Sequence, residues 1–252
     1  MLKIQNLYGG YGNKYVIKNI NVEIEQNIFV GIIGKNGSGK STLIKGIAGI
    51  LPYLTGEILF NQTSLRGKNG KKIISYVPQE SSIIFGFSVS EILKMSQNSY
   101  TTFFGRINEE EQKRLLWITE LFELKGLLDR SILTLSGGER KKVMIARGVA
   151  QMSDIILLDE PLSGLDIEHQ VSVSRILKDI SKNGRIVVAS IHDLNIAAQF
   201  CDKILLLENG EMVKYGTVEE VLTYNIIKNT FGVDVYVGVN EINNKRFLVP
   251  FK

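Results

Sequence analysis

A glycine-rich loop directly after a short apolar run constrains this chain more than any other feature. The run, Ile28–Ile33, is continuous and β-prone, as is typical of a strand buried on both faces of a parallel sheet. Residues 41–48, after the loop, have a helical composition. Strand, loop and helix in this order are the context of a phosphate-binding loop. The loop consists of Gly34, Lys35, Asn36, Gly37, Ser38, Gly39, Lys40, Ser41 and Thr42.

This phosphate loop (residues 34–42) predicts a site for a nucleoside triphosphate. The glycines let the backbone curl so that its N–H groups point at phosphates, and the following helix start adds partial positive charge. We expect Lys40 to reach the terminal phosphates and the Ser41 hydroxyl to ligate Mg²⁺. A glycine-rich turn with a chance Lys-Ser is the alternative, and the flanking strand and helix argue against it.

Two carboxylates follow a second apolar run, residues 155–158. Adjacent residues on a strand point to opposite sides, so Asp159 and Glu160 can serve different roles. Asp159 is the expected Mg²⁺ partner, through water. Glu160 is the expected general base that activates the water attacking the γ-phosphate. The alternative, a solvated acidic turn, explains a carboxylate pair at a strand end equally well when the pair is taken alone.

A third segment, which we call the signature segment (residues 135–139), precedes a predicted helix over residues 140–150. It reads Leu135, Ser136, Gly137, Gly138 and Glu139. A serine hydroxyl and unhindered backbone N–H groups at a helix start form an anion site, or simply a serine-capped helix.

The phosphate loop, the signature segment and the run ending in Asp159 and Glu160 occur in an order that resembles the ATPase subunit of ATP-binding-cassette (ABC) transporters. The resemblance extends from Leu2 to about Phe231. It implies an α/β fold: a P-loop NTPase, RecA-like core with a parallel sheet, an N-terminal antiparallel β region and an inserted helical subdomain. We expect one ABC ATPase domain over 1–252, with a nucleotide-binding core at 1–86 and 152–231, a helical subdomain at 87–151 that carries the signature segment, and a C-terminal β appendage at 232–252.

Local patterns agree with this division. Residues 91–95 have a helical composition, and a further helix is expected to start with Asn108 as its cap and Glu111 reaching back to it. Its apolar residues, at 115, 116, 118, 121, 122 and 124, recur at roughly helical spacing. Beyond Gly232, valines alternate with other residues, which predicts a short β segment.

The resemblance also implies roles for individual residues. Ser136 and Gly138, with Gly137 between them, are expected to bind the γ-phosphate held by a second copy, so that two ATP molecules hold a head-to-tail dimer together. Gln79 matches the glutamine that senses Mg²⁺ and the attacking water and relays that state to a permease. His192 matches the histidine that hydrogen-bonds the γ-phosphate. The catalytic set is therefore Lys40, Gln79, Glu160 and His192, and the Mg²⁺ set is Ser41, Gln79 and Asp159.

Two further matches are less specific. Tyr11 matches the aromatic residue that stacks on adenine, although Tyr8 and Tyr15 lie close to it in the sequence. Asp166 matches an aspartate that contacts the partner subunit, and it could cap a helix at the same time. His169 matches nothing in the family and is expected on the surface. Lys141 stands where many relatives have glutamine, which removes no required chemical group.

Composition limits the possible partners. The 252 residues carry a net charge of +4, too small to indicate nucleic acid binding. Cys201 is the sole cysteine, which predicts a reducing compartment. The N-terminus lacks the apolar stretch of a signal peptide, and the apolar runs are far shorter than the roughly 20 residues of a membrane span. We therefore expect a chain that does not cross a membrane. The resemblance to ABC transporter ATPases implies a peripheral protein at the cytoplasmic face of the cell membrane, where a separate integral membrane permease forms the pore.

Residues 192–198, 207–211 and 215–222 resemble importers of iron–siderophore complexes, haem and cobalamin. This implies an ATP-hydrolysing motor subunit that acts indirectly with a substrate-binding protein. One alternative is the related ATPase of iron–sulfur cluster assembly, which has a soluble scaffold partner. Others are an exporter ATPase, another class of ABC transporter, or a nucleic-acid or translation motor. A non-enzymatic regulator fits least, because Lys40, Asp159, Glu160 and His192 are all present.

Overall fold

The computed structural model describes residues 1–12, 14–67, 70–79, 85–96 and 109–251. Within them, the core is a six-stranded sheet in which five neighbouring strands run parallel and β10 joins one edge antiparallel. In spatial order the sheet contains β10 (Glu211–Thr217), β9 (Lys203–Glu208), β3 (Ile28–Ile33), β8 (Ile186–Ser190), β7 (Ile155–Leu158) and β6 (Ile74–Val77). The α/β class and the parallel core sheet predicted from the sequence are confirmed.

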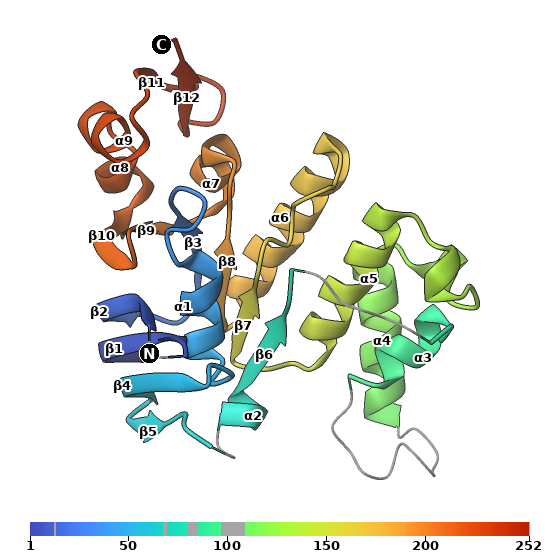
Figure 1. Ribbon diagram of the computed structural model, residues 1–252. Coiled ribbons are helices and arrows are strands. Elements are labelled where there is room, and N and C mark those ends of the chain that lie inside the picture. Colours follow the sequence, from blue (N-terminus) through green and yellow to red (C-terminus); the bar gives the residue numbers. More distant parts are fainter. Residues whose placement is uncertain (13, 68–69, 80–84, 97–108, 252) are drawn as a thin grey trace.

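Strand β3 shows why this sheet forms. All its residues are buried, and successive side chains enter different cores: Phe29 belongs to one hydrophobic cluster and Val30 to the other. Because alternate side chains on a strand project to opposite faces, a continuous apolar run needs a cover on both sides. An antiparallel sheet and a helix cover one face, and several helices cover the other (Figure 1).

The first cover is the predicted N-terminal antiparallel region. Its strands have the spatial order β2 (Lys14–Ile24), β1 (Leu2–Tyr11), β4 (Tyr53–Phe60) and β5 (Thr63–Ser64). Helix α1 (Lys40–Ile47) contacts both β1 and β8, so it lies between the two sheets. Helix α2 (Gly70–Ile73) leads into β6.

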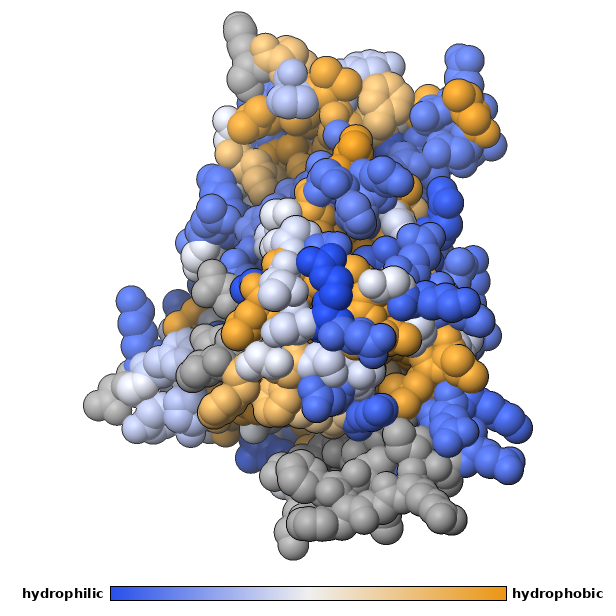
Figure 2. All heavy atoms as spheres, turned by 90° about the vertical axis from the view of Figure 1, so that its right-hand side faces the viewer, coloured by the Kyte–Doolittle hydropathy of each residue, from blue (hydrophilic) through white to orange (hydrophobic). Residues whose placement is uncertain are grey.

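Helices cover the opposite face. They are α5 (Gly137–Ala150), α6 (Ile167–Ser181) and α7 (Leu194–Phe200), with α3 (Val89–Lys94) and α4 (Glu109–Leu121) packed on α5 at one side (Figure 1). Two short 3₁₀ turns, at Lys125–Leu127 and Ile132–Thr134, precede α5. Viewed from the side of the molecule that carries α3, α4 and α5, the surface mixes hydrophilic residues with separate groups of apolar residues (Figure 2). Among the described residues, no helix combines the length and apolar character needed to span a membrane.

The expected helix around residues 109–124 is partly different. Helix α4 ends at Leu121, because Glu123 adopts a left-handed backbone with φ 52°. Phe122 and Leu124 lie beyond the helix but are fully buried, whereas Leu116 is 63% exposed. Helical spacing therefore grouped residues that tertiary packing separates. The proposed cap, Asn108, lies outside the described residues.

The last part of the chain contains two short helices and a hairpin. These are α8 (Val218–Val221), α9 (Tyr224–Phe231), β11 (Val235–Val239) and β12 (Arg246–Pro250). We call β11 and β12 the C-terminal hairpin; they pair antiparallel, and β12 contacts α7 (Figure 1). The alternating valines thus predicted a strand correctly, with its start at Val235.

Candidate nucleotide site

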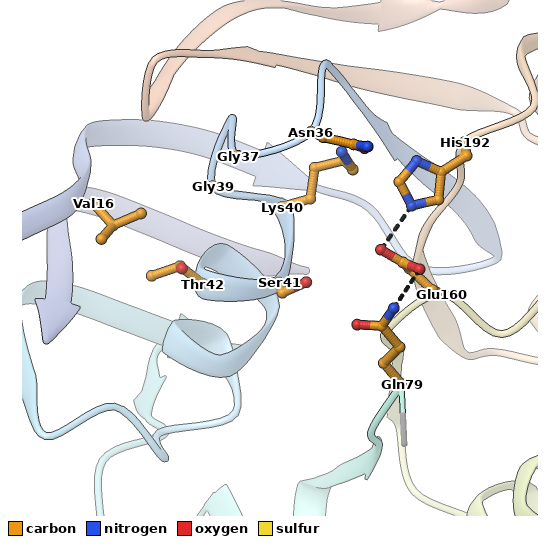
Figure 3. Close-up of a pocket in the computed structure, with 10 residues that line it drawn as sticks. All are labelled: Val16, Asn36, Gly37, Gly39, Lys40, Ser41, Thr42, Gln79, Glu160 and His192. Carbon is orange, nitrogen blue, oxygen red and sulfur yellow. Dashed lines mark hydrogen bonds and ion pairs between the residues drawn. The ribbon is translucent and has the colours of Figure 1, made fainter. Parts of the chain in front are cut away.

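The candidate site lies where four neighbouring parallel strands end. The phosphate loop follows β3, His192 follows β8, Glu160 follows β7 and Gln79 follows β6. The carboxyl ends of adjacent parallel strands meet at one edge of a sheet, where α/β proteins place their ligands. A cavity of about 380 Å³ opens there (Figure 3). Its lining residues are Val16, Asn36, Gly37, Gly39, Lys40, Ser41, Thr42, Gln79, Glu160 and His192.

The phosphate loop depends on glycine backbone geometry. Gly34 has φ 150°, and a Cβ on it would lie 2.3 Å from the carbonyl oxygen of Leu207. Gly37 has φ 79°, a conformation that side-chain-bearing residues rarely adopt. Gly34, Lys35 and Ser38 form the loop without lining the cavity. Within the described residues, the buried Ser38 Oγ has no hydrogen-bond partner.

Lys40 lies inside this loop. Its Nζ donates to the carbonyl oxygens of Gly34 (2.8 Å) and Lys35 (3.0 Å), and the residue is only 5% exposed. Burial lowers the pKa of the Lys40 ammonium, while the charges of Glu160 and Asp159 act in the opposite direction. A desolvated cation of this kind favours an anionic ligand that completes its charge balance.

Asp159 and Ser41 form the oxygen-rich part of the site. Asp159 is 2% exposed, and its Oδ1 accepts hydrogen bonds from Ser41 Oγ (2.8 Å) and Ser190 Oγ (3.0 Å). Among the described residues, no group of three or more His, Cys, Asp or Glu could hold a metal ion. Mg²⁺ is usually held by one or two protein oxygens together with substrate phosphates, so a hydroxyl beside a carboxylate fits this ion.

Glu160 is the point on which the side chains from neighbouring strands converge. Its Oε2 accepts from Gln79 Nε2 (2.6 Å), and its Oε1 lies 2.6 Å from His192 Nε2 (Figure 3). The Glu160 backbone has φ 48°, a left-handed conformation that non-glycine residues adopt at an energetic cost and often at functional sites. The side chains of Gln79 and His192 therefore hold the Glu160 carboxylate on the wall of the cavity opposite the phosphate loop (Figure 3).

Sequence reasoning missed Ser190. This buried serine donates to Asp159 Oδ1 and accepts from the Glu160 backbone N–H (2.7 Å), so it supports both carboxylate residues. The one available signal was a hydroxyl residue at the end of an otherwise apolar run, Ile186–Ser190, two positions before His192.

Replacing Ser190 with alanine should lower the free energy of unfolding by about 1–3 kcal/mol, because the Glu160 N–H loses its acceptor. It should also slow any turnover that depends on Glu160. Urea unfolding measures the stability. Ser174→Ala is the matched control, since Ser174 Oγ is buried without a hydrogen-bond partner among the described residues. Equal stability of the two variants would contradict a supporting role for Ser190.

The residues of the signature segment do not line this cavity. Ser136 caps α5, which begins at Gly137, three residues earlier than expected. Its Oγ accepts from Glu139 N (3.3 Å) and also donates to Glu139 Oε2 (2.9 Å). Next along α5, Lys141 Nζ donates to Ser163 O (2.9 Å). The helix start is thus a second possible anion site, and its residues are not among those that line the cavity of the same chain.

Two other predicted binding residues also lie outside the cavity lining. Asp166 caps α6: its Oδ1 accepts from His169 N (2.9 Å) and lies 2.7 Å from His169 Nδ1. His169, expected simply on the surface, is therefore partly exposed and paired with Asp166. Tyr11 is 46% exposed at the end of β1. Val16, which the sequence did not single out, lines the cavity instead.

Comparisons with known proteins show which families and structures the chain resembles. The family model described as ABC transporter matches residues 17–163. The chain is 32% identical over 248 residues to the iron(3+)-hydroxamate import ATP-binding protein FhuC of Bacillus subtilis, covering 97% of this chain and 92% of that protein. It is 35% identical over 246 residues to the hemin import ATP-binding protein HmuV of Pseudomonas fluorescens, covering 94% of each. The chain also superposes on a solved structure with a TM-score of 0.83 at 27% identity, covering 100% of this chain and 97% of that one. That structure is described as an inward-facing conformation of an ABC transporter assigned to the metal-chelate type.

Proposed function

The chain belongs to the ABC transporter family of ATP-binding proteins, and from this premise we propose that it hydrolyses ATP to drive import through a separate membrane permease. The observation that carries the proposal is the convergence of Gln79 and His192 on the Glu160 carboxylate beside the phosphate loop. This arrangement suits activation of a water molecule next to a bound phosphate chain.

The predicted residues in or beside the cavity have the following roles in this proposal. Lys40 and the backbone N–H groups of the loop bind the phosphates. Ser41 and Asp159, with Gln79, hold Mg²⁺, which when bound neutralises charge on the β- and γ-phosphates. Glu160 accepts a proton from the attacking water; a carboxylate has about four acceptor positions, so it can do this while Gln79 and His192 hold it. His192 then hydrogen-bonds the γ-phosphate.

A second copy completes the site in this proposal. The start of α5 is an anion site that does not line the cavity of its own chain. In a head-to-tail dimer, Ser136, Gly137 and Gly138 would bind the γ-phosphate held by the partner. Asp166, at the start of α6, would lie at the same interface, and Tyr11 would stack on adenine.

Ser136→Arg should block ATP-dependent dimerisation by placing a long side chain at the start of α5, while ATP binding to the monomer remains. Sedimentation or light scattering with ATP, in a Glu160→Gln background that prevents hydrolysis, measures the dimer. Ser64→Arg, on the exposed edge strand β5, is the matched control. Dimers that form equally well with Ser136→Arg would argue against the shared site.

The cargo proposed for the transporter is a metal chelate of the siderophore, haem or cobalamin group. The named cargoes of the two relatives, iron(3+)-hydroxamate and hemin, support this choice. We place the protein at the cytoplasmic face of the membrane, bound to the permease and acting indirectly with a substrate-binding protein.

The experiment that tests this function is purification of the tagged protein from gently solubilised native membranes, with an ATPase assay on the product. Recovery of a multi-span permease, and ATPase activity that rises with a cargo-loaded binding protein, would support the importer. Recovery with soluble scaffold proteins alone would leave ATP hydrolysis standing and overturn the transport assignment.

A further inference from the structure

The side chain of Asn195, near the start of α7, connects this helix to the C-terminal hairpin. Its Nδ2 donates to the carbonyl oxygen of Leu248 (3.1 Å), and its Oδ1 accepts from the Leu248 N–H (2.8 Å). The amide therefore satisfies both backbone groups of one β12 residue, as a neighbouring strand would. Because both bonds come from one planar amide, they determine the orientation of the Asn195 side chain relative to β12 as well as its distance from β12.

Asn195 is also part of the helix start that follows His192. The Asp193 carboxylate caps α7 by accepting from Asn195 N (2.7 Å) and Ile196 N (3.1 Å). His192 immediately precedes this cap. Asn195 thus contacts the hairpin through its side chain and the Asp193 cap through its backbone N–H, and Asp193 is the residue next to His192 in the chain.

The hairpin contacts α7 again one turn later. Gln199 Nε2 donates to Arg246 O (3.4 Å), and its Oε1 accepts from Asn243 Nδ2 (2.8 Å). Residues four apart lie on the same face of a helix, so Asn195 and Gln199 present one polar face to the hairpin. This contact has two points along the helix, which limits rotation of α7 as well as translation.

The hairpin is itself anchored. Leu248 (4% exposed) and Val235 (5%) belong to the same buried cluster as Ile196 of α7. Arg246 Nη1 also donates to Leu222 O (2.8 Å), which ties β12 to the end of α8. None of the residues that line the cavity comes from the hairpin. Any effect of the hairpin on the nucleotide site is therefore indirect, and its contacts with α7 give the shortest route along the chain to His192.

His192 depends on such support because burial does not hold it. Its side chain is 42% exposed, yet Nε2 lies 2.6 Å from Glu160 Oε1. On its N-terminal side, Ile191 N donates to Ile32 O (3.0 Å) and holds the backbone to β3. On its C-terminal side, the support is the Asp193 cap and the Asn195 contact with β12.

We propose that Asn195 is a positioning residue: by fixing α7 to the C-terminal hairpin, it holds His192 in place against Glu160. The inference rests on the proposed ATPase function and deepens it, because it gives the C-terminal hairpin a part in hydrolysis. Most of the proposed ATP contacts come from the phosphate loop, whereas His192 contributes one hydrogen bond to the γ-phosphate. We therefore expect the hairpin to affect the rate of hydrolysis far more than ATP binding.

Asn195→Ala should lower kcat for ATP about tenfold or more, since small misplacements of catalytic groups are costly, while KM stays nearly the same. A second readout comes from NMR, because the chain contains two histidines. The imidazole signal of His192 should shift in Asn195→Ala, and that of His169 should not. Asn229→Ala, on the exposed face of α9, is the matched control and should change neither quantity.

Asn195→Asp separates positioning from general damage to the fold. It keeps an oxygen that accepts from Leu248 N–H, but it loses the donor to Leu248 O and places a carboxylate oxygen against that carbonyl. We therefore expect kcat to fall and the His192 signal to shift in the same direction as in Asn195→Ala. A folded Asn195→Ala variant with unchanged kcat and an unchanged His192 signal would overturn the inference. If Asn195→Ala does not fold, Asn195→Asp decides the question: an unchanged kcat and an unchanged His192 signal in that variant would also overturn the inference. A wild-type protein that hydrolyses no ATP would refute the proposed function instead, and the His192 signal would still decide the inference.

Discussion

Glu160→Gln should reduce ATP turnover by about a hundredfold to ten-thousandfold, the range that a positioned general base contributes. Glutamine has nearly the same shape but cannot accept the proton of the attacking water. The phosphate contacts come from Lys40 and the loop backbone, so ATP affinity should change little. Single-turnover hydrolysis measured beside equilibrium ATP binding would show this separation, and an ATP-bound dimer should accumulate.

The control for this change is Glu219→Gln, which removes an exposed carboxylate on α8 that does not line the cavity. It should leave turnover unchanged. If Glu160→Gln retained wild-type turnover, Glu160 could not be the base. The convergence of Gln79 and His192 on it would then be a structural contact only.

Lys40→Ala should weaken ATP binding on the order of a hundredfold, because removing one partner of a buried charge contact costs about 2–5 kcal/mol. Lys40 is 5% exposed, and burial already lowers its pKa, so a phosphate gains from pairing with a cation that water does not screen. Titration with a non-hydrolysable ATP analogue measures the affinity.

Thermal unfolding without nucleotide must accompany this measurement, because the carbonyl groups of Gly34 and Lys35 lose their donor in Lys40→Ala. The matched control is Lys45→Ala, which lies on the same helix and outside the cavity lining. Equal ATP affinity in a folded Lys40→Ala variant would be incompatible with a phosphate loop at residues 34–42.

Features that depend on contiguous residues were predictable. The phosphate loop needs glycines, a lysine and a hydroxyl at set spacings between a strand and a helix, and all of them are adjacent in the sequence. The buried strands β3, β7 and β8 were predictable for the same reason, since an uninterrupted apolar run requires burial on both faces. The Ser136 cap on α5 and the Asp166 cap on α6 also follow from short local patterns.

Contacts between distant residues required the tertiary structure. Gln79 and Glu160 are 81 positions apart, and they meet because β6 and β7 are neighbours in the sheet. Ser190 accepts from the Glu160 backbone N–H because β8 is the neighbour of β7 on the side opposite β6. Asn195 hydrogen-bonds Leu248, which lies 53 positions away in the chain. The end of α4 was also set by packing, which buried Phe122 beyond the helix and exposed Leu116 within it.

Local sequence patterns were therefore sufficient to predict the fold class and the family and to propose the chemical groups of the site, because backbone curvature, caps and strand burial are local properties of neighbouring residues. The tertiary structure decided which of these groups touch, and it added Ser190 and Asn195. The physical reason is that strand order and helix docking arise from the packing of the whole core. An uninterrupted apolar run predicts that a strand is buried, but it does not show which elements the strand packs against.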